Sequence, residues 1–72
     1  MAGDHLELEG VVVGEEAGGH FRVTMTDTDK SVLAKLSGRM REKRIRVILG
    51  DSVRVRFSPY DLERGQIIYR NR

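Results

Sequence analysis

Apolar and polar residues alternate in short stretches along this chain, and this pattern limits what the chain can fold into. Phe21, Val23 and Met25 alternate with polar residues, and residues 53–57 repeat the same pattern. A period of two is typical of a strand with one buried face. The pattern predicts five strands, over residues 6–13, 20–26, 31–36, 53–57 and 66–70.

The segments between these stretches have the composition of turns. Residues 14–19 are rich in glycine, residues 27–30 are small and polar, and residues 50–51 form a Gly-Asp pair. Residues 59–65 are expected to form a longer turn that begins at a proline and closes at a glycine. A further glycine, Gly10, indicates a bend or bulge in the first strand, where a small barrel has to curve.

The longest irregular connection lies between the third and fourth strands. Ser37 is expected to cap a single helical turn through Met40 or Arg41, with Met40 as its apolar anchor. An SH3-like barrel also has five strands, but it does not normally place a helical turn after the third. The sequence therefore predicts an all-β fold, a five-stranded Greek-key OB-fold barrel with a short helical turn between strands three and four.

The size of the chain agrees with a closed barrel. It has 72 residues, no cysteine and two histidines without a ligand cluster at metal-site spacing. Stability must then come from hydrophobic packing, and a closed sheet achieves this in few residues because closure removes exposed edges. We expect one OB-fold domain over residues 1–72, with residues 1–5 as a flexible tail.

The connector over residues 37–46 carries five bases and one acid. Guanidinium groups this close together repel one another and resist burial, so an external anion is expected to balance them. The alternative is a solvated charged loop. We expect RNA contacts from Arg39, Arg41 and Arg46, with Lys43 and Arg44 as supporting charges.

Charge is divided unevenly along the chain. Residues 1–29 contain seven acids and one base, whereas residues 30–72 contain twelve bases and four acids. This division suggests one positive surface that faces an anion and one acidic surface that faces elsewhere. The alternative is that mixed charges simply solvate a small domain.

A second basic surface is a further possibility. Arg54 and Arg56 share the outer face of one strand, and Arg70 and Arg72 near the end of the chain would extend it across the barrel. Equally, this face could be a solvent face balanced by acids of neighbouring strands.

The aromatic residues separate two kinds of nucleic-acid binder. Phe21 and Phe57 fall on the apolar side of their strands and are expected in the core. Tyr60 and Tyr69 remain as candidates for stacking or surface contact, or for packing with only the hydroxyl at the surface. Because an unspecific single-strand binder uses several exposed rings, the sequence favours a protein that recognises folded RNA by shape and phosphate.

No catalytic arrangement emerges. The chain lacks a glycine-rich phosphate loop, its paired carboxylates lie in turns, and His20 is expected on the surface. We therefore expect neither an enzyme nor a cofactor, metal or small-molecule substrate. No apolar run approaches a membrane span and no signal peptide is evident, so we expect a cytoplasmic protein.

Several short motifs stand at characteristic separations along the chain. They are Ser37-Gly38-Arg39-Met40-Arg41, Ser58-Pro59-Tyr60-Asp61-Leu62 with Gly65, Phe21-Arg22-Val23, Ile45-Arg46, Gly50-Asp51, Val53 and Tyr69-Arg70. Taken together, these motifs resemble bacterial translation initiation factor one, from about Leu6 to the end of the chain. The combination of the first two motifs at their separation is specific to that family.

This resemblance implies an OB-fold monomer in the aminoacyl-tRNA (decoding) site of the small ribosomal subunit. Members of the family lie between the rRNA decoding helix and a neighbouring ribosomal protein, displace two decoding adenines, and cooperate with initiation factors two and three to favour initiator tRNA. By motif position, Arg41 and Arg46 would enter the minor groove of that helix. The other implied contacts come from Gly38, Arg39 and Met40, which would shape the loop, and from Arg64 and Arg70.

The chain departs from the family pattern at Lys35, at Lys43-Arg44 and at Gln66, where the family commonly has His, Asn-Tyr and a basic residue. Two other functions remain open. One is a general RNA chaperone of the cold-shock type on the same fold, and the other is a protein-interaction module whose acidic N-terminal half contacts a basic partner.

Overall fold

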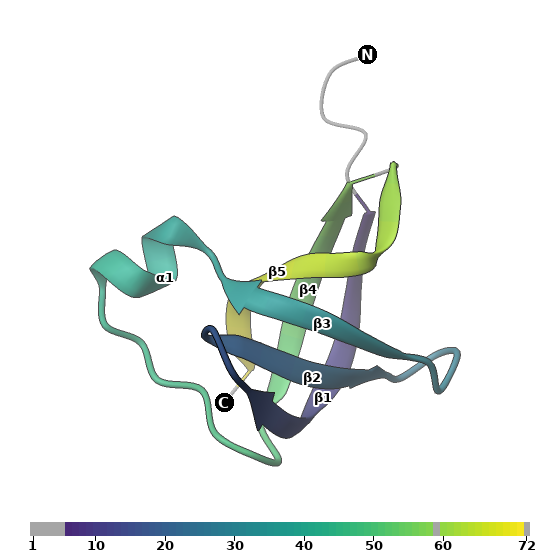
Figure 1. Ribbon diagram of the computed structural model, residues 1–72, viewed down its shortest axis with the longest axis horizontal. Helices are drawn as coiled ribbons and strands as arrows, with labels where there is room; N and C mark the ends of the chain where they lie inside the picture. Colours follow the sequence, from purple (N-terminus) through teal and green to yellow (C-terminus); the bar gives the residue numbers. More distant parts are fainter. Residues whose placement is uncertain (1–5, 59, 72) are drawn as a thin grey trace.

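The computed structural model describes residues 6–58 and 60–71, apart from the side chain of Leu62. The tail predicted over residues 1–5 lies outside this part of the chain. The described residues form five strands and one short helix (Figure 1). In chain order these are β1 (Leu6–Glu16), β2 (His20–Met25), β3 (Ser31–Leu36), α1 (Gly38–Glu42), β4 (Ser52–Ser58) and β5 (Asp61–Asn71).

The strands form a closed barrel in the order β1-β2-β3-β5-β4. All neighbouring pairs are antiparallel except β3 and β5, which run parallel and close the sheet. The chain between these two strands contains α1 and β4, and α1 with the loop that follows stands out to one side of the barrel (Figure 1). The predicted five-stranded OB-fold barrel with a helical turn after the third strand is confirmed.

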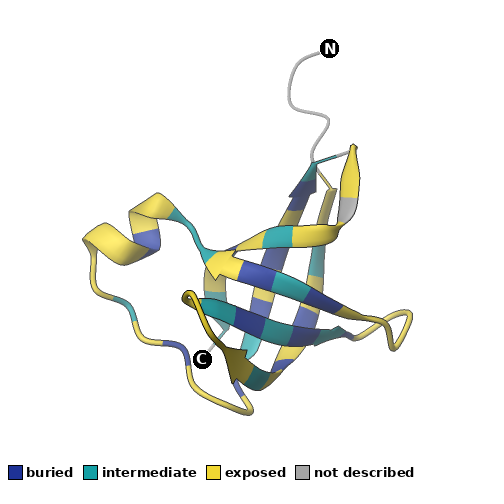
Figure 2. Cartoon of the chain, in the orientation of Figure 1, coloured by how far each residue is buried: buried dark blue, intermediate teal, exposed yellow. Residues whose placement is uncertain are grey.

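The barrel interior is filled by the residues that the alternation predicted to be inward. Phe21 and Phe57 are both in the core, and Leu36 packs against it. In Figure 2, buried residues alternate with intermediate ones along β2, and with intermediate or exposed ones along β3 and β4. The buried hydrophobic residues are Val12, Phe21, Val23, Met25, Val32, Ala34, Met40, Val47, Val53, Val55, Phe57 and Ile67.

At Gly10 the first strand pairs with both of its neighbours, but the bulge lies further along. Gly10 pairs with both Met25 and Val53, and a Cβ there would lie 2.6 Å from the Val23 side chain and 2.8 Å from the Thr24 carbonyl oxygen. The register shift itself falls between Val12 and Gly14, and β1 then continues to Glu16. The predicted turn over residues 14–19 is therefore too long, because pairing with β2 extends the strand.

The predicted long turn over residues 59–65 is also wrong. β5 begins at Asp61, which pairs with Ser58, and Gly65 pairs with Phe57. A Cβ at Gly65 would lie 2.5 Å from the Val55 side chain. Gly65 therefore allows β4 and β5 to approach each other closely. The polar residues 61–65 were expected in a turn, but pairing with β4 makes them part of a strand.

Candidate nucleic-acid interface

Helix α1 begins where the sequence predicts a cap. The backbone of Ser37 is extended, and its hydroxyl oxygen accepts a hydrogen bond from the Met40 amide at 3.3 Å. The Met40 side chain is only 2% exposed and belongs to the core cluster. The cap and the anchor are both confirmed, and together they fix a helix too short to be stable alone.

The C-terminal end of α1 is closed by a Schellman motif. The Ile45 amide donates to the Met40 carbonyl at 3.0 Å, and the Arg44 amide donates to the Arg41 carbonyl at 3.1 Å. Ile45 also packs against the core beside the buried Met40. The motif places Arg44 in the left-handed backbone conformation, with φ of 55°. A residue with a Cβ adopts that conformation at a cost of roughly 1–2 kcal/mol.

The loop after α1 is attached to the barrel on both sides of Arg46. Val47 is buried, as is Asp51, whose carboxylate accepts a hydrogen bond from the Ile48 amide at 3.0 Å. The Asp51 carbonyl accepts from the Val12 amide at 2.9 Å, and the Gly50 amide donates to the Val12 carbonyl at 2.8 Å. The alternating run Ile45-Arg46-Val47 thus leaves Arg46 exposed between two apolar anchors.

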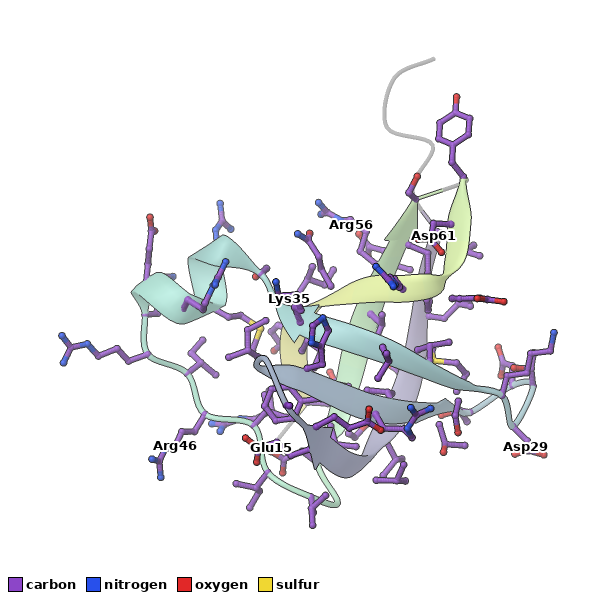
Figure 3. The ribbon with its side chains drawn as sticks, viewed as in Figure 1. Glu15, Asp29, Lys35, Arg46, Arg56 and Asp61 are labelled. Atoms are coloured by element: carbon purple, nitrogen blue, oxygen red, sulfur yellow. The ribbon has the colours of Figure 1, made fainter. Side chains whose placement is uncertain are left out.

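We call the cations of this region the α1 surface. All five are exposed, and within residues 6–58 and 60–71 no carboxylate lies at ion-pair distance from any of them. Figure 3 shows the Arg46 side chain extending away from the loop. The structure therefore brings together the central basic residues that the sequence predicted. The α1 surface consists of Arg39, Arg41, Lys43, Arg44 and Arg46.

Arg70 lies on a different side of β5 from the one expected. Ile68 is an extra residue between the pairs Val55↔Ile67 and Arg54↔Tyr69, so the register shifts there. Arg70 consequently lies opposite Val53, whose side chain is buried, and its guanidinium donates a hydrogen bond to the Arg46 carbonyl. One of the two interpretations that the sequence left open placed Arg70 on an outer surface with Arg54, and the structure contradicts it because that bulge reverses the alternation. Arg72, which the same interpretation included, lies outside the described residues.

The contact from Arg70 gives a first test. An Arg70→Met variant is expected to lose about 1 kcal/mol of unfolding free energy and to loosen the loop, since the Arg46 carbonyl loses its charged donor. Hydrogen exchange should accelerate at the Ile48 and Gly50 amides, which donate to the Asp51 carboxylate and the Val12 carbonyl. An Arg54→Met control, on the outer face of β4, should leave that exchange unchanged. Equal exchange in both variants would contradict a positioning role for Arg70.

The outer face of β4 is balanced by acids of β1. Arg54 lies 3.1 Å from the Glu9 carboxylate and 4.0 Å from that of Glu7, and Arg56 lies 3.6 Å from Glu7. The sequence left this face open between an RNA surface and a balanced solvent face, and the geometry favours the latter. The positive charge without a partner is therefore concentrated at the α1 surface.

The β1–β2 end carries a further ion pair. Arg22 Nε donates to a Glu16 carboxylate oxygen at 2.6 Å. This hydrogen bond lowers the pKa of the Glu16 carboxyl and raises that of Arg22. Both groups are exposed, so the pair balances charge without adding measurably to stability.

The remaining predicted site residues lie elsewhere on the barrel. Tyr60 is 94% exposed between β4 and β5, and Tyr69 is 60% exposed on β5 opposite Arg54. Arg64 is exposed on β5 and pairs with Leu33 of β3. In Figure 3 the Asp61 end of β5 and Arg46 lie on opposite sides of the molecule. The structure thus does not bring Tyr60 or Arg64 to the α1 surface, and neither tyrosine is packed in the core.

Other kinds of site are not seen in the described part of the chain. Among those residues, no three His, Cys, Asp or Glu side chains are placed to hold a metal ion. The helix found there is not long and apolar enough to cross a membrane.

Comparisons with known proteins agree with this architecture. The sequence model of the family described as Translation initiation factor 1A / IF-1 matches residues 2–72. The solution structure of translation initiation factor one from the Wolbachia endosymbiont strain TRS of Brugia malayi is 34% identical, with a TM-score of 0.79, covering 100% of this chain and 90% of that one.

Two larger proteins contain a similar barrel. YjeQ from Thermotoga maritima is 25% identical with a TM-score of 0.78, over 93% of this chain and 23% of that one. YloQ, a circularly permuted GTPase, is 20% identical with a TM-score of 0.74, over 100% of this chain and 25% of that one. The likeness to YloQ concerns the fold alone.

Proposed function

Because the chain belongs to the Translation initiation factor 1A / IF-1 family of non-enzymatic, ribosome-associated factors, we propose that it binds the decoding site of the small ribosomal subunit. The observation that carries this proposal is the α1 surface, five exposed cations without acidic partners among the described residues. An array of this kind suits the phosphates of folded RNA.

The proposed contact is made by two arginine side chains whose backbone is already fixed by the fold before RNA binds. Arg41 lies on α1 between the Ser37 cap and the Schellman motif, and Arg46 lies between two anchored residues. Both enter the shallow minor groove of the rRNA decoding helix, while the other cations neutralise phosphates nearby. Two decoding adenines are displaced, at a cost of a few kcal/mol by analogy with base unstacking.

The biological outcome follows from occupancy of that site. The bound protein, a cytoplasmic monomer, blocks the aminoacyl-tRNA site and rests against a neighbouring ribosomal protein. It acts with initiation factors two and three to favour initiator tRNA in the adjacent site. Arg64 and Arg70 are proposed as further RNA contacts, Arg70 in addition to its bond to the loop.

Binding to purified small ribosomal subunits, with excess unstructured RNA as competitor, tests the proposal. The five cations of the α1 surface together displace enough counterions from the rRNA for the affinity to fall about 100-fold or more between 50 and 200 mM salt. Binding should also survive the competitor, because folded rRNA is the specific partner. An affinity that changed by less than about threefold over this range would contradict electrostatic recognition by the α1 surface.

A general RNA chaperone of the cold-shock type is the second candidate, because Tyr60 and Tyr69 are exposed. Stacking on single strands needs several rings along one path. Tyr60 lies at the β4–β5 turn and Tyr69 lies beside Arg54 on the outer face, so the two rings belong to separate regions. Binding that the unstructured competitor abolished would favour this candidate. Binding that survived nuclease treatment of the subunits would instead favour a protein-interaction module.

A further inference from the structure

We propose that an exposed apolar patch, formed by β1 and the loop that leads into β4, binds a protein surface of the small ribosomal subunit. This inference rests on the proposed function, and it concerns residues outside the motifs that carry the family resemblance. In Figure 2 the loop that leads into β4 is mostly exposed. The apolar patch consists of Val11, Val13, Ile48 and Leu49.

Backbone hydrogen bonds hold the two segments of the apolar patch side by side. The Gly50 amide donates to the Val12 carbonyl at 2.8 Å, and the Val12 amide donates to the Asp51 carbonyl at 2.9 Å. The Ile48 amide donates to the buried Asp51 carboxylate at 3.0 Å. Because the backbone of the patch is fixed by the fold, a partner can bind it without the entropy cost of ordering a loop.

The apolar patch gathers most of the exposed apolar side chains of the described residues. Val11 and Val13 are 39% and 51% exposed, and Ile48 and Leu49 are 55% and 63% exposed. These are four of the seven large hydrophobic residues that are exposed in this part of the chain. Single exposed apolar residues are common, whereas a group of them marks a surface that a partner covers.

Charge beside the apolar patch favours protein over RNA as the partner. Glu15 follows Val13 on β1, is exposed, and has no cation at ion-pair distance within residues 6–58 and 60–71. Figure 3 shows Glu15 on the same side of the molecule as Arg46. A carboxylate at this edge repels RNA phosphates and attracts the basic side chains of a protein.

The position of the apolar patch along the chain indicates which protein covers it. Ile48 and Leu49 follow Arg46 in the same loop, so a partner of the patch lies directly beside the RNA that Arg46 contacts in the proposed complex. A ribosomal protein is fixed relative to that RNA. The partner surface is therefore ribosomal protein, with apolar side chains against the patch and a basic group opposite Glu15.

An Ile48→Ser/Leu49→Ser variant tests this inference, with affinity for small subunits measured over a range of salt. The affinity should fall about tenfold or more at every salt concentration, because two apolar side chains no longer bury their surface against the partner. The slope of log affinity against log salt should stay that of the wild type, because no charge has been removed. Affinity for protein-free small-subunit rRNA should stay within about twofold, since the α1 surface is intact.

A Glu15→Lys variant separates the two kinds of partner by the sign of its effect. It replaces a negative charge with a positive one, which strengthens attraction to RNA phosphates but repels a basic protein surface. Affinity for the small subunit should fall about threefold or more, while affinity for protein-free rRNA should rise.

Leu6→Ser is the matched control, because it removes an exposed apolar side chain at a distance from the apolar patch. Leu6 is 46% exposed at the start of β1, where it pairs with Phe57. Its replacement should leave the subunit affinity within about twofold. Circular dichroism checks that every variant stays folded.

Binding of the Ile48→Ser/Leu49→Ser variant within about twofold of the wild type would overturn this inference. An equal loss on protein-free rRNA would also overturn it, because the patch would then contact RNA. Self-association of the wild type that this variant abolished would assign the patch to copies of this chain instead.

An Arg41→Ala/Arg46→Ala variant in the same experiment distinguishes two kinds of failure. If that variant lost binding while the patch variant kept it, the failure would concern the apolar patch alone. If both variants kept their binding, the proposed function would fail first and this inference with it.

Discussion

Replacing Arg41 and Arg46 together by alanine is expected to weaken binding to small ribosomal subunits by at least about 100-fold, while the barrel stays folded. Each residue is an exposed member of the α1 surface without an acidic partner in the described structure. Charged hydrogen bonds are worth about 1.5–3 kcal/mol each, so the loss of two gives an effect of this size. Equilibrium binding at near-physiological salt measures it, and far-ultraviolet circular dichroism checks the fold.

An Arg54→Ala/Arg56→Ala variant is the matched control, since it removes the same number of positive charges from the same protein. The two variants therefore change the net charge equally, although this one also leaves Glu7 and Glu9 without their partners. Its affinity should stay within about threefold, because these side chains lie on a balanced outer face. Equal losses in the two variants would show that net charge, and not the α1 surface, governs binding.

Gly10→Ala is expected to lower the unfolding free energy by about 3 kcal/mol, because the new Cβ overpacks the barrel wall. That atom would lie 2.6 Å from the Val23 side chain and 2.8 Å from the Thr24 carbonyl oxygen, and a backbone atom cannot move aside as a flexible side chain can. For a domain of this size the loss corresponds to a fall in Tm of roughly 12–24 °C. Thermal unfolding followed by circular dichroism measures it.

Gly14→Ala provides the comparison within the same strand. A Cβ at Gly14 would lie 3.7 Å from the nearest neighbour, the Arg22 Cβ, which is an ordinary contact distance. This substitution should change the unfolding free energy by less than about 1 kcal/mol, and the restricted unfolded chain favours a small gain. Similar losses at both glycines would mean that strand glycines matter through flexibility, in contradiction to the close approach at Gly10.

The architecture was predictable because hydrophobic periodicity survives in β2, β3 and β4 of this small barrel. Phe21 and Phe57 fall on the buried side of their strands, and Ser37 and Met40 mark the cap and the anchor of α1. The bases from Arg39 to Arg46 are close in sequence, so they necessarily lie close together in the structure. Features that depend on neighbouring residues within one element are the ones that sequence patterns report best.

What the sequence did not reveal depends on pairing between distant segments. The extra residue at Ile68 reverses the alternation in β5, so Arg70 turned out to contact the Arg46 carbonyl and not to share the outer face. The strand limits at Glu16 and Asp61 come from their partners. The left-handed backbone conformation of Arg44 could not be predicted, because the usual signal for it, a glycine or asparagine, is absent at that position.

The parallel pairing of β3 with β5 has a consequence for how the barrel forms during synthesis. Residues 61–71 lie between β3 and β4 in the closed sheet, so the N-terminal strands cannot complete their hydrogen bonding until β5 has left the ribosome. The β1–β2–β3 meander is free to assemble earlier, since its contacts are local. Until β5 inserts, one edge of β3 remains unpaired, and a nascent chain halted at that stage would expose a strand edge open to aggregation.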